Sequence, residues 1–311
     1  MPWQADEVGD VGRGVEDPGD GVVLLDGGLA TELERRGHDL SDDLWSARLL
    51  LEDPDAVRDT HLAFFRAGAQ VATTASYQAS FEGFARHGLS RDESVALMRR
   101  SVALAREAAQ VAGRPGLRVA ASVGPYGAVL ADGSEYRGDY GVSDAVLRAF
   151  HLPRAEVLAG AGADLLAIET VPSEQEVTVL LDVLSQLPPS TRAWLSLTCA
   201  DGATTRAGED VDRVFALARG NDQVVAVGVN CTAPEHVAEL VSRATAASGK
   251  PAVAYPNSGE SWDAAAHAWG GDGAGVDPDT ARGWVAAGAR YVGGCCRVGA
   301  PGIARLADAL V

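Results

Sequence analysis

Eight short stretches of apolar and small residues recur along the chain, and each ends in polar or glycine-rich sequence. They start at Val22, Ala69, Arg118, Ala163, Arg192, Val224, Pro251 and Tyr291. Their apolar residues are almost continuous, whereas a strand with one face in water alternates apolar and polar positions. The pattern therefore predicts eight strands that are covered on both faces, as in a parallel sheet.

Amphipathic helical patterns separate these stretches. Ser90 and Glu93 form a capping-box sequence at the start of one of them. Strand and helix patterns alternate eight times, which favours a closed (β/α)8 TIM barrel over an open doubly wound sheet. We expect a single α/β domain over residues 21–311. The helices are predicted over 53–69, 90–113, 143–164, 173–187, 233–249 and 277–290.

Two segments lie outside this pattern. Residues 1–20 are acidic and rich in glycine, which predicts a flexible N-terminal tail. The loop 257–278, which follows the seventh strand, is long and rich in glycine. It is expected to form a flexible cover over one end of the barrel.

Composition narrows the classes of function. The formal net charge of −17 argues against nucleic acid or an anionic membrane as a partner. There is no 18-residue apolar run and no signal-peptide layout, so we expect no membrane span and a cytoplasmic location. The four cysteines are too few for a disulfide scaffold, and in a reducing compartment clustered thiols favour metal binding or catalysis.

Candidate chemistry lies where the predicted strands end, because TIM-barrel enzymes carry their active sites at the carboxyl ends of the strands. Cys199 is interpreted as a small buried hydrophobic residue at the fifth strand end. Three other cysteines follow strands six and eight. The polar residues and thiols at this end are Asp26, Thr73, Thr74, Tyr77, Glu169, Thr170, Asn230, Cys231, Tyr255, Asn257, Cys295 and Cys296.

Cys231, Cys295 and Cys296 have the composition of a catalytic zinc site, with three protein ligands and one open position. Gly293 and Gly294 are expected to let the eighth strand bend so that both following thiols turn inward. No histidine follows a strand, which argues against a hydrolytic zinc site. Three thiolates favour a metal that holds a substrate thiolate, and the reaction predicted for it is alkylation of that sulfur.

Several motifs resemble the zinc-dependent homocysteine S-methyltransferases. They are LDGGLATELERRG (25–37), LWSARLLLEDPDAV (44–57), TTASYQAS (73–80), IETVPSEQE (168–176), GVNCT (228–232) and GGCCRVGAPGI (293–303). The resemblance extends from about residue 22 to the C-terminus. It implies a (β/α)8 barrel with Zn²⁺ held by Cys231, Cys295 and Cys296. It also implies that the homocysteine thiolate attacks a methyl group on a sulfonium or quaternary ammonium donor.

The resemblance also implies roles for other residues. Asp26 and Glu169 would hold the amino group of homocysteine, and Asn230 would orient the loop beside the zinc. Trp45 and Tyr77 match positions of aromatic residues near the methyl donor, where their faces suit a cation. The expected substrate-binding set is Asp26, Gly27, Gly28, Trp45, Thr73, Tyr77, Glu169, Tyr255 and Asn257, and the expected catalytic residues are Asp26, Glu169 and Asn230.

The donor is expected to be S-methylmethionine, with S-adenosylmethionine as a less efficient donor. The chain ends soon after the eighth unit, without the C-terminal extension of the betaine-using branch, and it has no G-x-G-x-x-G motif after a strand. Two alternatives stay open: a zinc-binding or redox-sensing barrel without turnover, and a betaine- or selenocysteine-type methyltransferase. The expected partners are small molecules, and the expected assembly is a monomer or a weak homo-oligomer.

Overall fold

The computed structural model describes residues 19, 21–40, 46–130, 132–263, 268–270 and 276–311. Eight parallel strands form one sheet in the order β1-β10-β7-β6-β5-β4-β3-β2. A bridge between Leu25 and Val71 joins the first and last strands of this order, so the sheet closes on itself. The predicted (β/α)8 barrel is confirmed. Its strands are β1 (Val23–Leu24), β2 (Val71–Thr73), β3 (Arg118–Val123), β4 (Leu165–Val171), β5 (Ala193–Leu197), β6 (Val224–Asn230), β7 (Ala252–Tyr255) and β10 (Ala289–Val292).

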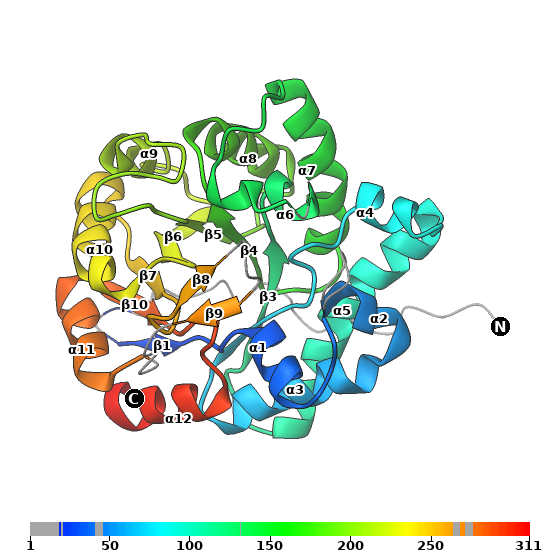
Figure 1. Ribbon diagram of the computed structural model, residues 1–311, viewed down its shortest axis with the longest axis horizontal. Coiled ribbons are helices and arrows are strands. Elements are labelled where there is room, and N and C mark those ends of the chain that lie inside the picture. The colour runs from blue at the N-terminus through cyan, green and yellow to red at the C-terminus, as the bar shows by residue number, and fades with distance from the viewer. Residues whose placement is uncertain (1–18, 20, 41–45, 131, 264–267, 271–275) are drawn as a thin grey trace.

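Helices surround the strands, as Figure 1 shows. Eight of them follow the eight barrel strands in turn: α3 (Pro54–Arg66), α5 (Arg91–Ala112), α7 (Asp144–Ala159), α8 (Glu174–Gln186), α9 (Val211–Ala216), α10 (Pro234–Ser248), α11 (Pro278–Ala287) and α12 (Ala300–Leu310). Shorter helices lie in the connections at the carboxyl ends of the first three strands: α1 (Leu29–Arg35), α2 (Ser46–Glu52), α4 (Phe81–Arg86), α6 (Tyr126–Leu130) and the 3-10 helix η1 (Ser134–Tyr136).

The sequence signals for helix ends have the expected physical causes. Ser90 and Glu93 form the predicted capping box at the start of α5. Ser173 and Asp277 accept backbone N–H groups in the first turns of α8 and α11. Each cap satisfies a donor that the helix itself leaves without a partner.

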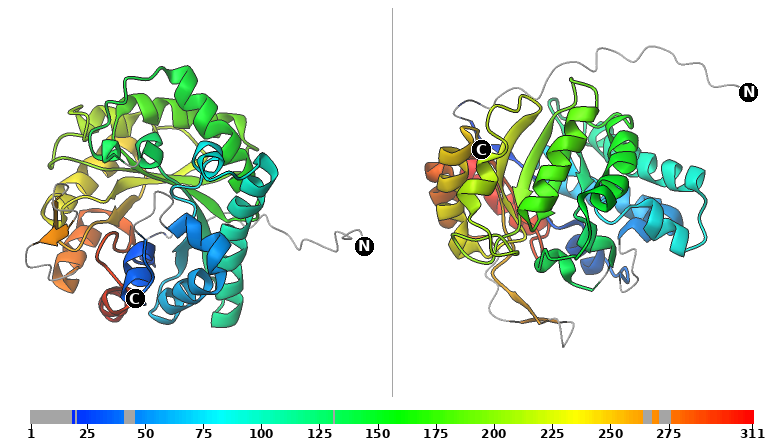
Figure 2. Two further views of the ribbon diagram at one scale, coloured as in Figure 1. Left: turned by 45° about the vertical axis from the view of Figure 1, so that its right-hand side comes forward. Right: turned by 90° about the horizontal axis from the view of Figure 1, so that it is seen from above.

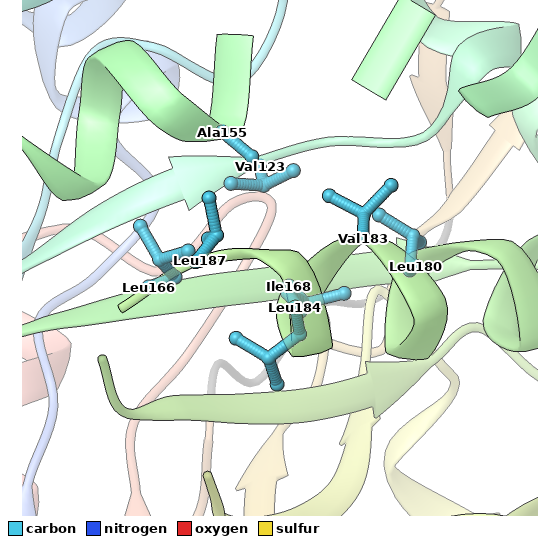
Figure 3. Close-up of a pocket in the computed structure, with 8 residues that line it drawn as sticks. All are labelled: Val123, Ala155, Leu166, Ile168, Leu180, Val183, Leu184 and Leu187. Atoms are coloured by element: carbon cyan, nitrogen blue, oxygen red, sulfur yellow. The ribbon is translucent and has the colours of Figure 1, made fainter. Parts of the chain in front are cut away.

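Apolar side chains fill both faces of the sheet. Trp194, Tyr291 and Val253 belong to a cluster inside the barrel, so the interior is a packed core and not a channel. Outside, α7 and α8 pack on β3 and β4 through aliphatic residues, and Figure 3 shows eight residues of this layer around a small gap. This gap of about 10 Å³ has no polar lining, and water or a ligand would find no hydrogen-bond partner there.

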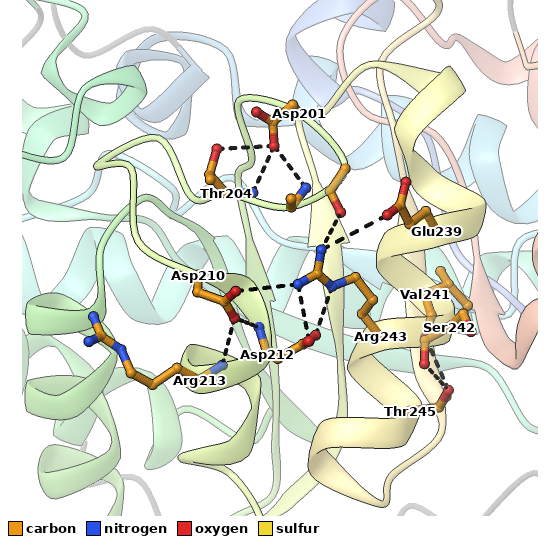
Figure 4. Close-up of polar contacts among 12 residues, drawn as sticks. Asp201, Thr204, Asp210, Asp212, Arg213, Glu239, Val241, Ser242, Arg243 and Thr245 are labelled. Carbon is orange, nitrogen blue, oxygen red and sulfur yellow. Dashed lines mark hydrogen bonds and ion pairs between the residues drawn. The ribbon is translucent and has the colours of Figure 1, made fainter.

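A polar network ties the connection after β5 to the outer helices. Arg243 on α10 pairs with Asp212 at 2.8 Å and with Asp210 at 3.5 Å, both at the start of α9, and donates to the carbonyl of Gly202 (Figure 4). Asp201 accepts from the backbone N–H groups of two residues in the same connection. Because both carboxylates that pair with Arg243 are more than half exposed, each ion pair contributes little stability, and the network mainly fixes the path of the loop.

The connection after β7 contains an antiparallel hairpin of β8 (Ser261–Asp263) and β9 (Ala268–Gly270). Figure 2 shows this hairpin standing out from the barrel. The predicted cover thus contains regular structure, although 264–267 and 271–275 lie outside the described residues. The predicted tail also lies outside them, apart from Gly19. Among the described residues no helix is both long and apolar enough to cross a membrane.

Candidate active site and metal centre

A cavity of about 110 Å³ lies at the carboxyl ends of the barrel strands. Predicted site residues that line it are Gly27, Gly28, Thr73, Tyr77, Glu169, Cys231, Tyr255, Cys295 and Cys296. These residues come from six strand ends that are far apart in the sequence. The closed barrel therefore brings the predicted thiols, one predicted carboxylate and two aromatic side chains to a single space.

Three of the four cysteines meet at this cavity. Cys296 Sγ lies 3.9 Å from Cys231 Sγ and 4.0 Å from Cys295 Sγ, and all three sulfurs form a group that could hold a metal ion. A tetrahedral ion with metal–sulfur bonds of about 2.3 Å spaces its ligands about 3.8 Å apart, so these two separations fit. Cys231 and Cys295 are closer, at 2.6 Å, and would move apart by about 1 Å around such an ion.

The thiols need a positive charge in order to ionise. Contact with the Cys231 thiol and burial raise the pKa of Cys295 well above its usual value. Cys199, in contrast, is 1% exposed and does not join the cluster, and burial raises its pKa to about 12. This matches its interpretation as a structural residue. Three thiols in one cluster form a donor set that a thiophilic metal fits, because binding it would release their protons.

The backbone turns sharply at the thiols. Cys231 has a φ of 47° and Arg297 a φ of 65°, both in the left-handed region that non-glycine residues rarely adopt. Neither Gly293 nor Gly294 has a positive φ. A Cβ at Gly293 would lie 2.7 Å from the Asp26 carbonyl oxygen, and one at Gly294 would lie 2.4 Å from the Val298 side chain. The two glycines thus allow close packing, and the left-handed backbone conformation in this segment occurs at Arg297.

Asp26 is fully buried next to the cavity and is surrounded by donors. Its carboxylate accepts the Tyr255 hydroxyl at 2.7 Å, the Thr73 backbone N–H at 2.7 Å and the Thr73 hydroxyl at 3.1 Å. Burial raises the Asp26 pKa to about 7, although these hydrogen bonds oppose the shift. Thr73 and Tyr255 line the cavity and Asp26 does not, so Asp26 influences the cavity through these two residues.

Glu169 lines the cavity directly and is 5% exposed. Burial raises its pKa to about 7, and the charge of Asp26 contributes to the shift. Ser122 donates a hydrogen bond to one carboxylate oxygen of Glu169, and the Asn230 amide donates to the other at 3.4 Å. Two buried carboxyl groups that disfavour each other's charge form a place where a cation is stabilised.

Asn230 connects this carboxylate to the metal-site loop. Its Oδ1 accepts the backbone N–H of Thr170 at 2.6 Å and the Ser196 hydroxyl at 2.8 Å, and its Nδ2 donates to the Thr170 hydroxyl at 2.7 Å. Thr170 has a φ of 58°, a rare conformation for a β-branched residue. Asn230 therefore holds a strained turn next to Glu169 and directly precedes Cys231.

The other expected residues have different outcomes. Asn257 does not line the cavity; its backbone N–H donates to the Thr232 carbonyl, and its buried Oδ1 has no partner among the described residues. Trp45 lies outside the described residues. Cavity residues that the sequence reasoning did not select include Ser122, Glu135 and Tyr136. The polar sequence DGSEYRGDY at 132–140 was the available signal for the last two, but it follows a strand only after a short helix.

The cavity has no basic lining. None of the described residues around it is a lysine, an arginine or a histidine, while two glutamates and three tyrosines are present. Its chemistry therefore suits positively charged ligands, and it offers no side chain for a Schiff base or for histidine general-base catalysis.

The homocysteine S-methyltransferase family model matches residues 23–310. This chain belongs to the homocysteine S-methyltransferase family. It is 49% identical over 292 residues to "Homocysteine S-methyltransferase" of Escherichia coli, covering 92% of this chain and 94% of that protein. It is 42% identical to "Homocysteine S-methyltransferase YbgG" of Bacillus subtilis, covering 89% of this chain and 90% of that protein.

Solved structures of the family share the fold. The metallated form of the homocysteine methyltransferase MmuM from Escherichia coli superposes with a TM-score of 0.83 and 46% identity, over 92% of this chain and 96% of that one. Its oxidized form has a TM-score of 0.85 at 46% identity, over 96% of this chain and 99% of that one.

Proposed function

We propose that this homocysteine S-methyltransferase transfers a methyl group from S-methylmethionine to homocysteine at a Zn²⁺ ion held by Cys231, Cys295 and Cys296. The observation that carries the proposal is the three-thiol cluster on a cavity with buried carboxylates and no basic side chain. Such a cavity accepts the amino group of the acceptor and a positively charged donor.

Zinc is the metal that this donor set fits best. Three sulfur ligands with one open position are typical of a catalytic zinc site, and the metallated MmuM structure supports metal binding in the family. When bound, Zn²⁺ would keep the homocysteine sulfur as a thiolate, with a lowered thiol pKa and retained nucleophilicity. The three cysteines would hold the ion, and Asn230 would fix the loop that carries Cys231.

The carboxylates would fix the acceptor. Glu169 lines the cavity and would pair with the homocysteine ammonium group. Asp26 lies behind Thr73 and Tyr255 and would orient both by hydrogen bonds. Its negative charge would also attract the homocysteine ammonium group. Gly27 and Gly28 also line the cavity. A Cβ at Gly27 would lie 2.3 Å from the Val298 carbonyl oxygen and one at Gly28 would lie 2.5 Å from the Cys295 carbonyl oxygen, so glycine at these positions lets the thiol loop pack against this wall.

The transfer step itself needs little from the protein except positioning. The acceptor sulfur forms a bond to the donor methyl carbon as the carbon–sulfur bond of the donor breaks. The electron pair of that bond stays on the donor sulfur, and a neutral thioether leaves, so no general base acts in this step. Tyr77 lines the cavity and would offer an aromatic face to the sulfonium before it loses its charge.

The test is a donor comparison on metal-loaded protein. The chain is purified under reducing conditions, its zinc content is measured, and methionine formation from homocysteine is followed with S-methylmethionine, S-adenosylmethionine and betaine in separate reactions. We expect stoichiometric zinc and the highest turnover with S-methylmethionine. Zinc-loaded protein that forms no methionine with any donor would refute the proposal and favour a metal-binding or redox-sensing role.

A second acceptor is supported by one comparison. The "Selenocysteine methyltransferase" of Astragalus bisulcatus is 40% identical over 299 residues. We therefore propose selenocysteine as a weaker alternative acceptor, because a selenolate can occupy the same open metal position. The four free thiols suit a reducing compartment, and we propose the cytoplasm as the location and a monomer or weak homo-oligomer as the assembly.

A further inference from the structure

Glu135 lines the cavity but has no role in the chemistry described so far. It lies on η1, is 8% exposed and lines the cavity. Its Oε2 atom is completely buried and has no hydrogen-bond partner, and no ion pair involves Glu135 among the described residues. A buried carboxylate oxygen without a partner is costly, so its presence at a ligand cavity indicates that a ligand supplies the partner.

The charged residues of the same segment do not neutralise Glu135. Asp132 and Arg137 pair with each other at 3.5 Å, and both side chains are more than half exposed. Burial raises the Glu135 pKa, the negative charge of Asp132 adds to this shift, and its own backbone N–H and the charge of Arg137 oppose it without reversing it. No basic side chain among the described residues lines the cavity. A cationic group on a ligand would therefore supply the charge that keeps the Glu135 carboxylate ionised.

The position of Glu135 is fixed by packing. A Cβ at Gly127 on α6 would lie 2.5 Å from the Glu135 backbone nitrogen and 2.7 Å from the Tyr140 ring. The Ser134 backbone N–H donates to Asp132 at 2.9 Å, and the Ser134 hydroxyl donates to the Gly127 carbonyl. Helix η1 therefore sits directly on α6, and Glu135 is held at the cavity wall.

Two aromatic rings connect Glu135 with the thiols. Tyr77 and Tyr136 both line the cavity. The pKa of each phenol is raised by burial first, and then by the charges of Cys231 and Glu135. Both rings also share one cavity wall with the metal-site sulfur of Cys231 and with the unpartnered carboxylate. Arg206 lies 5.7 Å from the Tyr136 ring centre, so this ring already receives one cation.

We propose that Glu135 binds the α-ammonium group of the methyl donor, so that the site selects sulfonium donors that carry a free amino group. This inference rests on the proposed function. The donor sulfonium must lie next to the acceptor sulfur, where Tyr77 is available, and the remaining cationic group of the donor then reaches Glu135.

Glu135 is assigned to the ammonium group of the donor and not to its sulfonium group because of what happens to each charge during the reaction. The sulfonium loses its charge as its methyl carbon moves to the acceptor, so a carboxylate in contact with it would stabilise the ground state more than the transition state. The ammonium keeps its charge throughout. A carboxylate there binds both states equally and lowers KM without slowing the chemical step.

The experiment combines a donor analogue with a variant. Wild type and Glu135→Gln are compared with S-methylmethionine and with (3-carboxypropyl)dimethylsulfonium, which is the same donor without the amino group. We expect wild type to prefer S-methylmethionine by at least about tenfold in kcat/KM, since a charged hydrogen bond is lost with the analogue. Glu135→Gln should raise the KM for S-methylmethionine by a similar factor, keep kcat, and discriminate little between the two donors.

Asp139→Asn is the matched control, because it removes one negative charge from an exposed position in the same segment. It should leave both donors unaffected, and zinc content and homocysteine KM should stay unchanged in both variants. The inference is overturned if wild type uses the two donors equally well, or if Glu135→Gln impairs both donors to the same extent. If wild type forms no methionine from any sulfonium donor, the proposed function itself fails.

Discussion

The two sides of the cavity differ in how their carboxylates are held. On the proposed acceptor side, Asp26 and Glu169 belong to strand ends and receive hydrogen bonds from Thr73, Tyr255, Ser122 and Asn230. On the proposed donor side, Glu135 belongs to a short 3-10 helix and has one oxygen without a partner among the described residues. The sheet thus holds the first pair of carboxylates without a ligand, whereas Glu135 has a free oxygen for the ligand that we propose.

The largest expected effect concerns the thiols between the two sides. Cys231→Ser replaces a soft sulfur ligand with a hydroxyl, so zinc content should fall and methionine formation should drop by at least about 100-fold. Zinc analysis and turnover with S-methylmethionine measure this. Cys199→Ala is the control, since Cys199 is buried away from the cluster, and it should keep its zinc. Equal zinc in wild type and Cys231→Ser would contradict the proposed ligand set.

The next effect separates the acceptor side from the donor side. Glu169→Gln removes the charge proposed to hold the homocysteine amino group, and the KM for homocysteine should rise by about 10- to 100-fold. The KM for the donor should change much less, which is the reverse of the result expected for Glu135→Gln. Steady-state kinetics with each substrate varied in turn measures both. A Glu169→Gln variant with an altered donor KM and a normal homocysteine KM would remove the distinction between the two sides.

A pH dependence of acceptor binding should follow from the same carboxylates. The pKa values of Asp26 and Glu169 are both raised to about 7, so both groups gain charge between pH 6 and pH 8. L-Homoserine carries the same amino group as homocysteine but no thiol that titrates in this range. Its inhibition constant should fall by about tenfold from pH 6 to pH 8. A constant value would show that these carboxylates do not hold the amino group.

The same pKa shifts make folding stability fall as the pH rises, whereas acceptor binding is expected to improve. Because the folded-state pKa values of Asp26 and Glu169 lie above the usual values of 3.8 and 4.5, their contribution to stability is fully present below those usual values. It is lost as the pH rises through about 7. A bound ammonium group should offset this loss, so homoserine should raise the melting temperature more at pH 8 than at pH 6.

The smallest expected effect sharpens the role of Asp26. The Tyr255 hydroxyl donates to Asp26 and is the largest influence that lowers the Asp26 pKa. Tyr255→Phe should therefore raise that pKa further, by up to about one unit. The pH at which homoserine binding improves should move upward accordingly, with little change in kcat. An unchanged pH profile would show that Asp26 does not influence binding through Tyr255.

The sequence allowed the barrel and its acceptor side to be predicted, because both follow from regular features. Eight apolar stretches indicated the strands, and residues near the carboxyl end of a strand, such as Glu169 in β4 and Cys231 after β6, had to reach the same end. Glu135 was not found in this way. It follows β3 only after α6, and its place depends on packing against Gly127 that no periodic pattern encodes.

The packing role of two glycines was also not found from the sequence. Gly293 and Gly294 were expected to let the strand end bend, and the structure shows in addition that a side chain at either position would collide with Asp26 or Val298. Gly293 and Asp26 are more than 260 residues apart in the sequence, whereas Gly294 and Val298 are close neighbours. A sequence pattern shows that a glycine is present and not which of these requirements it meets.

The most direct test of the account removes the metal and restores it. Wild-type protein is treated with a chelator under reducing conditions, and zinc is then added in steps while methionine formation from homocysteine and S-methylmethionine is measured. The account predicts that activity is lost with the metal. It should return in proportion to bound zinc, up to one zinc ion per chain at the site of Cys231, Cys295 and Cys296. Full activity of the metal-free protein would contradict it.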